Sequence, residues 1–285
     1  MHVFRLLPAQ IDQYRAAGYL LLPSHFTHDE IDLLRTTAQS DKQLHSHAFG
    51  KIDGKGNPVR LSVWNHPEDN LYGMFSRCDR VVGVAEQILD DEPYHYHSKM
   101  ILKDAESGGA WEWHQDYGYW YHNGLLQPKL TSCFIAIDAA TRENGCLQVI
   151  PKSHKLGRMD HHRTGEQSTV DPERMEAILK IYPSQDILMK PGDVLFFHAN
   201  LLHRSNPNNS TQSRWAMICC YNARSNSPYK ESHHSSYTHI ERVPDSAIRS
   251  FGSQGFSDNE SNTSWLQDAS HQGTRTRSTT KRNEI

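Results

Sequence analysis

The chain has 285 residues, a formal net charge of −3 at pH 7 and five cysteines. This length allows one large β-domain with a full core, or two small ones. A charge so near neutrality gives no basic field for nucleic acid, no apolar run is long enough for a transmembrane helix, and the N-terminus lacks a signal peptide. Cysteines without a C-x-x-C pair are typical of a reducing compartment. We therefore expect a cytoplasmic protein whose partners are neither membranes nor nucleic acids.

The N-terminal third favours helices. Helices are predicted over residues 8–17, 27–39 and 79–89, with one strand over residues 19–22. Gly18 closes the first helix, and the capping box Thr27-His-Asp-Glu30 opens the second. Residues 41–58 are polar and contain glycine, so we expect a mobile loop there, near the mouth of an active site.

Strand signals dominate from Tyr94 onward. Segments rich in β-branched and aromatic residues predict strands over residues 95–102, 110–117, 130–137, 146–150, 186–189, 194–197 and 214–221. Asn144-Gly145 is typical of a tight hairpin turn between two of these strands. The insertion over residues 153–184, with a predicted helix over residues 172–181, has the length of a functional lid. The expected fold class is mainly β with flanking helices.

The C-terminal segment has a different composition. After about Pro244 the chain is rich in Ser, Asn, Gln and Thr, and Trp265-Leu266 is its one apolar pair. Such a segment cannot bury enough apolar area to offset the entropy of ordering. We therefore expect a folded catalytic domain over residues 1–250 and a polar, disordered tail over residues 251–285.

The tripeptide His114-Gln115-Asp116 holds two metal-binding residue types at a useful spacing. On an extended backbone, residues i and i+2 point to the same side, so His114 and Asp116 can reach one ion. Together with His203 they give the two imidazoles and one carboxylate of a non-haem Fe(II) oxygenase, which leave other positions open. Asp116 argues against a halogenase, because its carboxylate fills the position that chloride would need.

His198 competes with His203 for the role of distal ligand. The two histidines lie five residues apart, so they would face opposite sides of an unbroken strand. Only His203 is followed by Ser205 two residues later and by Arg214 eleven residues later. A guanidinium and a hydroxyl suit the far carboxylate of a dicarboxylate keto acid, because arginine binds carboxylates bidentately. This pattern favours His203, with a solvent-exposed Arg214 as the alternative.

Several segments between about residues 10 and 245 carry a family resemblance. They are Trp113-His-Gln-Asp116, Glu143-Asn-Gly-Cys-Leu-Gln-Val-Ile-Pro-Lys-Ser-His154, Pro191-Gly-Asp-Val-Leu-Phe-Phe-His198, His203-Arg-Ser205 and Arg214. In these segments the chain resembles the phytanoyl-CoA dioxygenase family of Fe(II)/2-oxoglutarate oxygenases, which includes the ectoine hydroxylases. The resemblance implies a double-stranded β-helix, the jelly roll also found in cupins.

The resemblance also implies the roles of individual residues. It places iron on His114, Asp116 and His203, and 2-oxoglutarate on Arg214 and Ser205, with further contacts from Lys99 and Ser132. The implied reaction uses O₂, converts 2-oxoglutarate to succinate and CO₂, and hydroxylates an unactivated C–H bond. A solvated strand lysine is the alternative interpretation of Lys99.

The expected substrate is a small polar or anionic metabolite. Trp120 falls where ectoine hydroxylases also carry a tryptophan, and with Tyr117 it could bind an ammonium group or shield the iron from water. Aromatic core packing is the alternative for both rings. Arg60 offers a cation for an anionic group. Ile101 stands where an ectoine hydroxylase has an asparagine, which argues against ectoine itself.

Three other functions stay open at this point. One is an acyl-CoA 2-hydroxylase of the phytanoyl-CoA type, although no pantetheine-binding signal is present. Another is a cupin-like metal-dependent isomerase or hydrolase, which would have no use for Arg214 and Ser205. The third is a catalytically silent binding module, which would be expected to lack at least one metal ligand.

Overall fold

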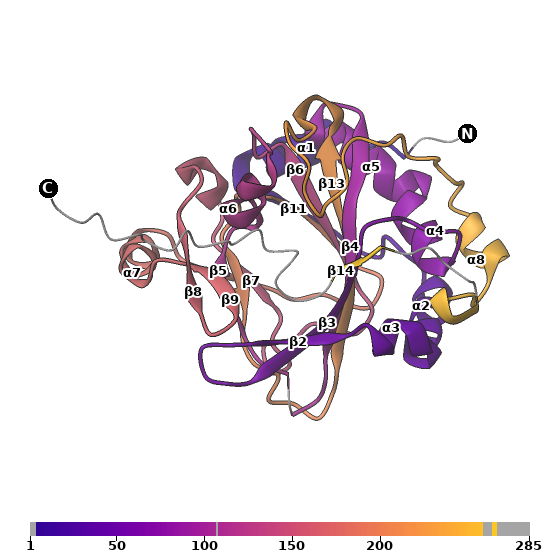
Figure 1. Ribbon diagram of the computed structural model, residues 1–285, viewed down its shortest axis with the longest axis horizontal. Coiled ribbons are helices and arrows are strands. Elements are labelled where there is room, and N and C mark those ends of the chain that lie inside the picture. The colour runs from indigo at the N-terminus through magenta and orange to yellow at the C-terminus, as the bar shows by residue number, and fades with distance from the viewer. Residues whose placement is uncertain (1–3, 107, 259–263, 267–285) are drawn as a thin grey trace, which may run out of the picture.

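The computed structural model describes residues 4–106, 108–258 and 264–266. Its main feature is a large antiparallel sheet with the strand order β1-β11-β6-β13-β4-β3-β14, in which β2 also pairs with β3 (Figure 1). These strands are β1 (Tyr19–Leu22), β2 (Phe49–Ile52), β3 (Pro58–Trp64), β4 (Pro93–Lys103), β6 (Leu130–Ala136), β11 (Val194–His198), β13 (Arg214–Ala223) and β14 (Trp265–Leu266).

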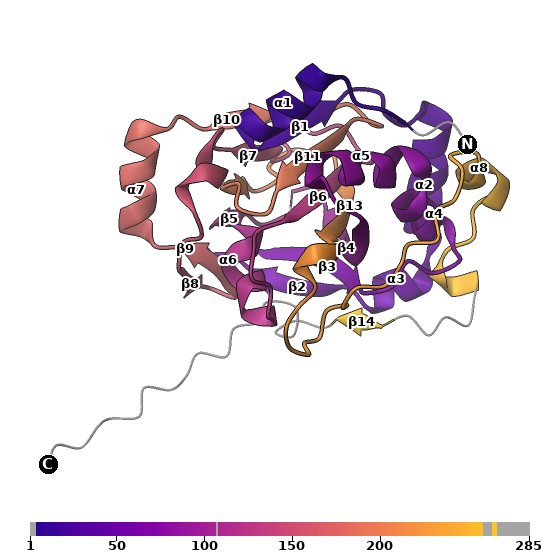
Figure 2. The ribbon, with the colours of Figure 1, turned by 90° about the horizontal axis from the view of Figure 1, so that it is seen from above.

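A smaller antiparallel sheet, in the order β10-β7-β12-β5, lies on one side of the large one and shares an apolar core with it (Figure 2). Its strands are β5 (Trp111–His114), β7 (Leu147–Val149), β10 (Gln185–Ile187) and β12 (His203–Ser205). A separate hairpin of β8 (His161–Thr164) and β9 (Gln167–Val170) lies beside β5. The two facing sheets confirm the predicted mainly β jelly roll.

The helices surround this pair of sheets. They are α1 (Pro8–Ala17), α2 (His28–Ser40), α3 (Lys42–Ser46), α4 (Leu71–Arg77), α5 (Asp79–Leu89), α6 (Asp116–Trp120), α7 (Pro172–Ile181) and α8 (Ala247–Phe251), with short 3₁₀ turns η1 (Tyr121–Asn123), η2 (Ser153–Leu156), η3 (Arg224–Asn226) and η4 (Phe256–Asp258). In Figure 1, α2, α4 and α5 lie on the opposite side of the large sheet from β5, β8 and β9. Among the described residues, no helix is long and apolar enough to cross a membrane.

Alternating side chains of β13 show why the large sheet is covered on both faces. Met217 and Cys219 belong to the core beneath the helices, whereas Ile218 and Cys220 belong to the core between the two sheets. All four side chains are buried, as expected for a strand whose residues alternate between two apolar layers. Full burial of an aliphatic side chain such as Ile218 stabilises the fold by about 1.5–3 kcal/mol.

The predicted capping box forms at the start of α2. The Thr27 hydroxyl accepts a hydrogen bond from the Glu30 amide, and the Glu30 carboxylate accepts one from the Thr27 amide at 2.9 Å. Glu30 also pairs with Arg80 of α5 at 2.8 Å, so the same carboxylate joins two helices. The helix predicted over residues 79–89 is present as α5.

Two local predictions are wrong. Residues 41–58 are not a loop, because they contain α3, β2 and the first residue of β3. The Asn144-Gly145 turn does not close a hairpin, because β6 and β7 belong to different sheets. Instead the turn carries the chain from one sheet to the other, and the Thr141 amide donates to Asn144 Oδ1 at 2.8 Å within it.

The described residues after 250 pack against the domain. Phe256 is fully buried, with its ring 4.8 Å from that of Tyr72, and β14 pairs with β3 so that Trp265 lies opposite Trp64. The domain boundary expected at residue 250 is therefore too early. The rest of the expected tail, residues 259–263 and 267–285, lies outside the described residues.

Candidate active site

The three predicted metal ligands meet where the small sheet borders α6. His114 ends β5, Asp116 begins α6, and His203 begins β12 directly opposite His114 in the ladder. One possible ligand atom from each residue lies within 4.8 Å of the others, and His114 Nε2 is 3.9 Å from Asp116 Oδ1. Gln115 between them has extended backbone angles of −115° and 134°, as the same-side argument for residues i and i+2 requires.

Backbone carbonyls fix both imidazoles for metal binding. His114 Nδ1 lies 2.7 Å from the carbonyl oxygen of Glu112, and His203 Nδ1 lies 2.9 Å from that of Leu201. Since a carbonyl only accepts, each Nδ1 carries the proton and each Nε2 keeps a lone pair for the metal. Burial lowers the pKa of both histidines, so the imidazoles are neutral.

Two hydroxyl groups orient the Asp116 carboxylate. Tyr119 donates to its Oδ1 at 2.8 Å and Ser132 donates to its Oδ2 at 3.1 Å. Burial by itself would raise the pKa of Asp116, but the charge of Lys99 and the hydrogen bond from Tyr119 outweigh that effect and lower the pKa below its ordinary value. The carboxylate is therefore anionic, as a metal ligand must be.

Gln115 fastens the metal-binding segment to two loops. Its fully buried side chain donates to the carbonyl oxygens of Gly157 and Asn200, both at 2.8 Å, and accepts from the Met159 amide at 2.8 Å. Its backbone amide donates to His161 Nε2 at 2.9 Å. The middle residue of the H-x-D motif thus holds the start of the 153–184 insertion against the ligands.

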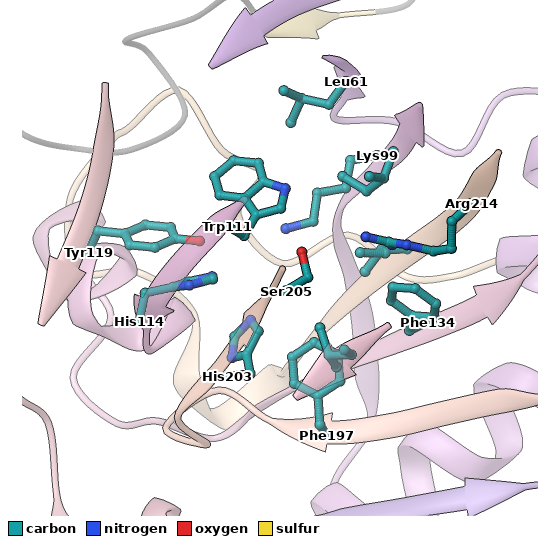
Figure 3. Close-up of a pocket in the computed structure, with 13 residues that line it drawn as sticks. Leu61, Lys99, Trp111, His114, Tyr119, Phe134, Phe197, His203, Ser205 and Arg214 are labelled. Atoms are coloured by element: carbon teal, nitrogen blue, oxygen red, sulfur yellow. The ribbon is translucent and has the colours of Figure 1, made fainter. Parts of the chain in front are cut away.

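A pocket with an empty volume of about 570 Å³ opens beside the metal ligands. Figure 3 shows His114 and His203 on one side of it and Arg214 on the other, with the side chains of Ser205 and Lys99 between them. The pocket is lined by Leu61, Lys99, Ile101, Trp111, His114, Tyr119, Phe134, Leu147, Phe197, His203, Ser205, Arg214 and Ile218.

Arg214 is not the solvent-exposed cation that the alternative interpretation required. Its side chain is only 2% exposed, and its Nε has no hydrogen-bond partner among the described residues. Burial lowers the pKa of Arg214 to about 10, which still leaves it charged at neutral pH. A buried guanidinium that faces a pocket without a carboxylate partner is suited to an anionic ligand.

The other predicted residues lie in different places. Ser132 contacts Asp116 instead of lining the pocket. The Tyr117 hydroxyl donates to the Leu125 carbonyl, and Trp120 is buried against Tyr96. Arg60 forms an ion pair with Asp104 at 2.8 Å on the surface. His198 is absent from the metal cluster, and its Nδ1 accepts from the Asn200 amide.

Sequence reasoning missed Tyr119 and Trp111, which both line the pocket. Tyr119 had a usable signal, because it follows Asp116 by three residues in a helix and therefore lies over the same face. Trp111 is three residues before His114 on a strand, where periodicity alone places it on the opposite face. The irregular register between β5 and β12 accounts for its inward position.

A family model for phytanoyl-CoA dioxygenase matches residues 14–216. The chain belongs to this family. Over 239 residues it is 28% identical to L-proline trans-4-hydroxylase from Streptomyces griseoviridis, covering 78% of this chain and 88% of that protein. It is 26% identical over 236 residues to ectoine dioxygenase from Halomonas elongata, covering 78% of this chain and 71% of that protein.

Solved structures are also similar to this chain in fold. The crystal structure of EctD from S. alaskensis with 2-oxoglutarate and 5-hydroxyectoine has a TM-score of 0.71 at 24% identity, covering 84% of this chain and 88% of that one. The phytanoyl-CoA dioxygenase family match and the hydroxylase relatives identify the chain as a 2-oxoglutarate-dependent dioxygenase.

The donor set in this structure fits the iron of that family. Two neutral imidazoles and one carboxylate form a three-residue set, and the pocket adjoins them. When bound, Fe(II) supplies the activation of O₂ at the expense of 2-oxoglutarate. His114, Asp116 and His203 would hold it.

Proposed function

We propose that this protein hydroxylates an unactivated C–H bond of a small metabolite that carries an acidic group, with release of succinate and CO₂. The observation that carries the proposal is the arrangement of one pocket, in which the metal-binding histidines and Arg214 lie on opposite sides with Ser205 and Lys99 between them (Figure 3). A dicarboxylate keto acid can therefore reach the metal with one end and Arg214 with the other.

Size favours a small substrate. The pocket of about 570 Å³ includes space open to solvent, and it must hold 2-oxoglutarate as well as the reacting part of the substrate. The named substrates of the relatives are small: proline, ectoine and, for a protein from Gimesia maris that is 26% identical over 235 residues, methylphosphonate. All three compounds carry an acidic group.

The charge of the site also favours an acidic substrate. The pocket presents Lys99 and Arg214, and the metal site adds Asp116 and a divalent ion. Counted together with dianionic 2-oxoglutarate, these groups leave an excess of about one positive charge, or about two with the buried ammonium of Lys103 beside Ser205, because bound ions must be included in the local balance. A substrate carboxylate or phosphonate would neutralise it.

Each part of the site has a proposed role. Arg214 and Ser205 bind the far carboxylate of 2-oxoglutarate, and Lys99 lies where it can contact an anionic group near the metal. Leu61, Trp111 and Tyr119 are the proposed substrate contacts. They replace Tyr117, Trp120 and Arg60, whose side chains do not line the pocket. The apolar lining excludes water, which strengthens the interactions of the charged groups.

A substrate panel tests the proposal. Purified protein with Fe(II) and 2-oxoglutarate under air is given L-proline, ectoine, methylphosphonate and a fatty acyl-CoA, and succinate and product mass are measured. We expect an acidic small molecule to stimulate succinate formation and to gain one oxygen atom, and its methyl ester to be a much poorer substrate. Equal turnover of acid and ester, or turnover of the acyl-CoA alone, would contradict the proposal.

A further inference from the structure

A second buried cation lies behind the proposed co-substrate site. Lys103 ends β4 and lies opposite Arg214 in the ladder with β13, and its side chain is fully buried. Its ammonium donates to Ser205 Oγ at 2.9 Å and to the carbonyl oxygen of Asn206. Among the described residues, no carboxylate forms an ion pair with Lys103 or Arg214.

We propose that Lys103 is a positioning residue of the 2-oxoglutarate site, which acts by fixing the hydroxyl of Ser205. The inference rests on the proposed function, because it takes Arg214 and Ser205 as the residues that bind the far carboxylate.

The argument begins with the hydrogen-bonding capacity of the two groups. A charged lysine only donates, whereas a serine hydroxyl has one proton and two lone pairs. Lys103 therefore occupies a lone pair of Ser205, and Ser205 cannot donate its own proton back to Lys103. That proton is left for the pocket, which Ser205 and Arg214 both line. The co-substrate carboxylate would receive donors from both residues.

Two glycines allow the close packing around Lys103 and its hydrogen-bond acceptor. A side chain on Gly108 would bring a Cβ within 2.5 Å of Lys103 Cγ, so glycine there makes room for the lysine. A Cβ on Gly145, whose φ is +75°, would lie 2.2 Å from the Asn206 carbonyl oxygen. The Asn144-Gly145 turn thus packs directly on the carbonyl that accepts from Lys103.

The two buried cations, Lys103 and Arg214, also favour the binding of an anion. Burial lowers the pKa of Lys103 well below its ordinary value, and the adjacent Arg214 lowers it further, whereas a bound carboxylate would raise this pKa and keep the amine protonated. Two neighbouring cations in a buried site repel each other, and a bound carboxylate would relieve that repulsion.

The test compares 2-oxoglutarate binding by Lys103→Met and by Lys129→Met, both full-length and loaded with Fe(II) under anaerobic conditions. Lys129 is a matched control, since it pairs with Asp91 at 2.7 Å and does not line the pocket. We expect Lys103→Met to raise the Kd about tenfold, the scale of a lost hydrogen bond to a charged group. Its kcat at saturating 2-oxoglutarate should be unchanged, and Lys129→Met should bind like the wild type.

A double-mutant cycle tests the route through Ser205. If Lys103 acts mainly through this hydroxyl, Lys103→Met should raise the Kd several-fold less in the Ser205→Ala background than in the wild-type protein, and only the through-space effect of its charge should remain. Additive losses, or unchanged affinity in Lys103→Met, would overturn the inference. Lys103→Gln, whose shorter amide does not reach Ser205, should show the same loss and replaces Lys103→Met if that variant does not fold.

Arg214→Met separates this inference from the proposed function. If Arg214→Met loses 2-oxoglutarate affinity and Lys103→Met does not, only the role of Lys103 is wrong. If Arg214→Met also binds normally, the co-substrate site itself is misplaced.

Discussion

Replacement of Arg214 should weaken 2-oxoglutarate binding more than replacement of any other pocket residue outside the metal ligands. Its guanidinium is buried at 2% exposure, and its Nε has no partner among the described residues, so a bound carboxylate would depend on it heavily. Loss of one partner from such a buried charged pair costs roughly 2–5 kcal/mol, which corresponds to a Kd about 30-fold to several thousand-fold higher. Arg214→Lys should recover only part of this affinity, because an ammonium lacks the planar fork.

Titration calorimetry of Fe(II)-loaded protein with 2-oxoglutarate, without oxygen, measures this loss directly. Arg204→Met is the matched control, because Arg204 lies on β12 of the smaller sheet, donates to Gln148 Oε1 at 2.6 Å and does not line the pocket. Normal 2-oxoglutarate affinity in both Arg214→Met and Arg214→Lys would refute the assignment and favour a cupin-like enzyme that needs no keto acid.

Three further predictions concern the scaffold. Gln115→Leu should lower the free energy of unfolding by at least about 2 kcal/mol in denaturant titrations, because buried carbonyls lose their donor, whereas Gln127→Leu on the surface should not. A chain ending at Ser250 should melt several degrees below one ending at Leu266, because it lacks Phe256 and β14, and equal melting would contradict the packing of this segment. Burial lowers the pKa of His95 to about 3, so only the unfolded chain gains this proton between pH 6.5 and pH 3. The free energy of unfolding should therefore decrease as the pH is lowered through that window, by up to about 1.4 kcal/mol per pH unit from this residue. A flat profile from pH 7 to pH 5 would contradict this prediction.

The sequence predicted the elements whose signals are local. The capping box at Thr27 and the alternating strand that contains Cys219 and Cys220 depend on neighbouring residues, and both form as expected. The H-x-D motif was also readable, because the extended backbone at Gln115 is enough to direct both ligands to one side. His203 was distinguishable from His198 because Ser205 follows it by two residues and Arg214 by eleven, and the structure places these three residues in one pocket.

The failures have a common physical origin in contacts between distant segments. β2 was missed because its four residues include Gly50 and Lys51, which are uncommon in strands, and they form a strand by pairing with β3. The Asn144-Gly145 turn looks like a hairpin turn locally, but the partners of β6 and β7 are strands far away in the sequence. Phe256 is buried against Tyr72, which a composition argument about a polar tail cannot anticipate.

The substrate residues were the least predictable part of the site. Tyr117 and Trp120 follow the metal motif directly, yet the short helix α6 turns them away from the pocket and leaves Tyr119 facing the ligands. Lys103 gave no signal at all, because its role depends on the β4–β13 register that places it opposite Arg214.

Iron content is the most direct test of the central claim that His114, Asp116 and His203 form the metal centre. Wild-type protein, His203→Ala and His198→Ala are each loaded with Fe(II) without oxygen, desalted and assayed for bound iron. His198 is the matched control, because it is a partly buried histidine five positions earlier that lies outside the metal cluster. We expect about one iron per chain in the wild type and in His198→Ala, and almost none in His203→Ala, which keeps only two of three ligands. Retention of iron by His203→Ala together with its loss from His198→Ala would contradict the account.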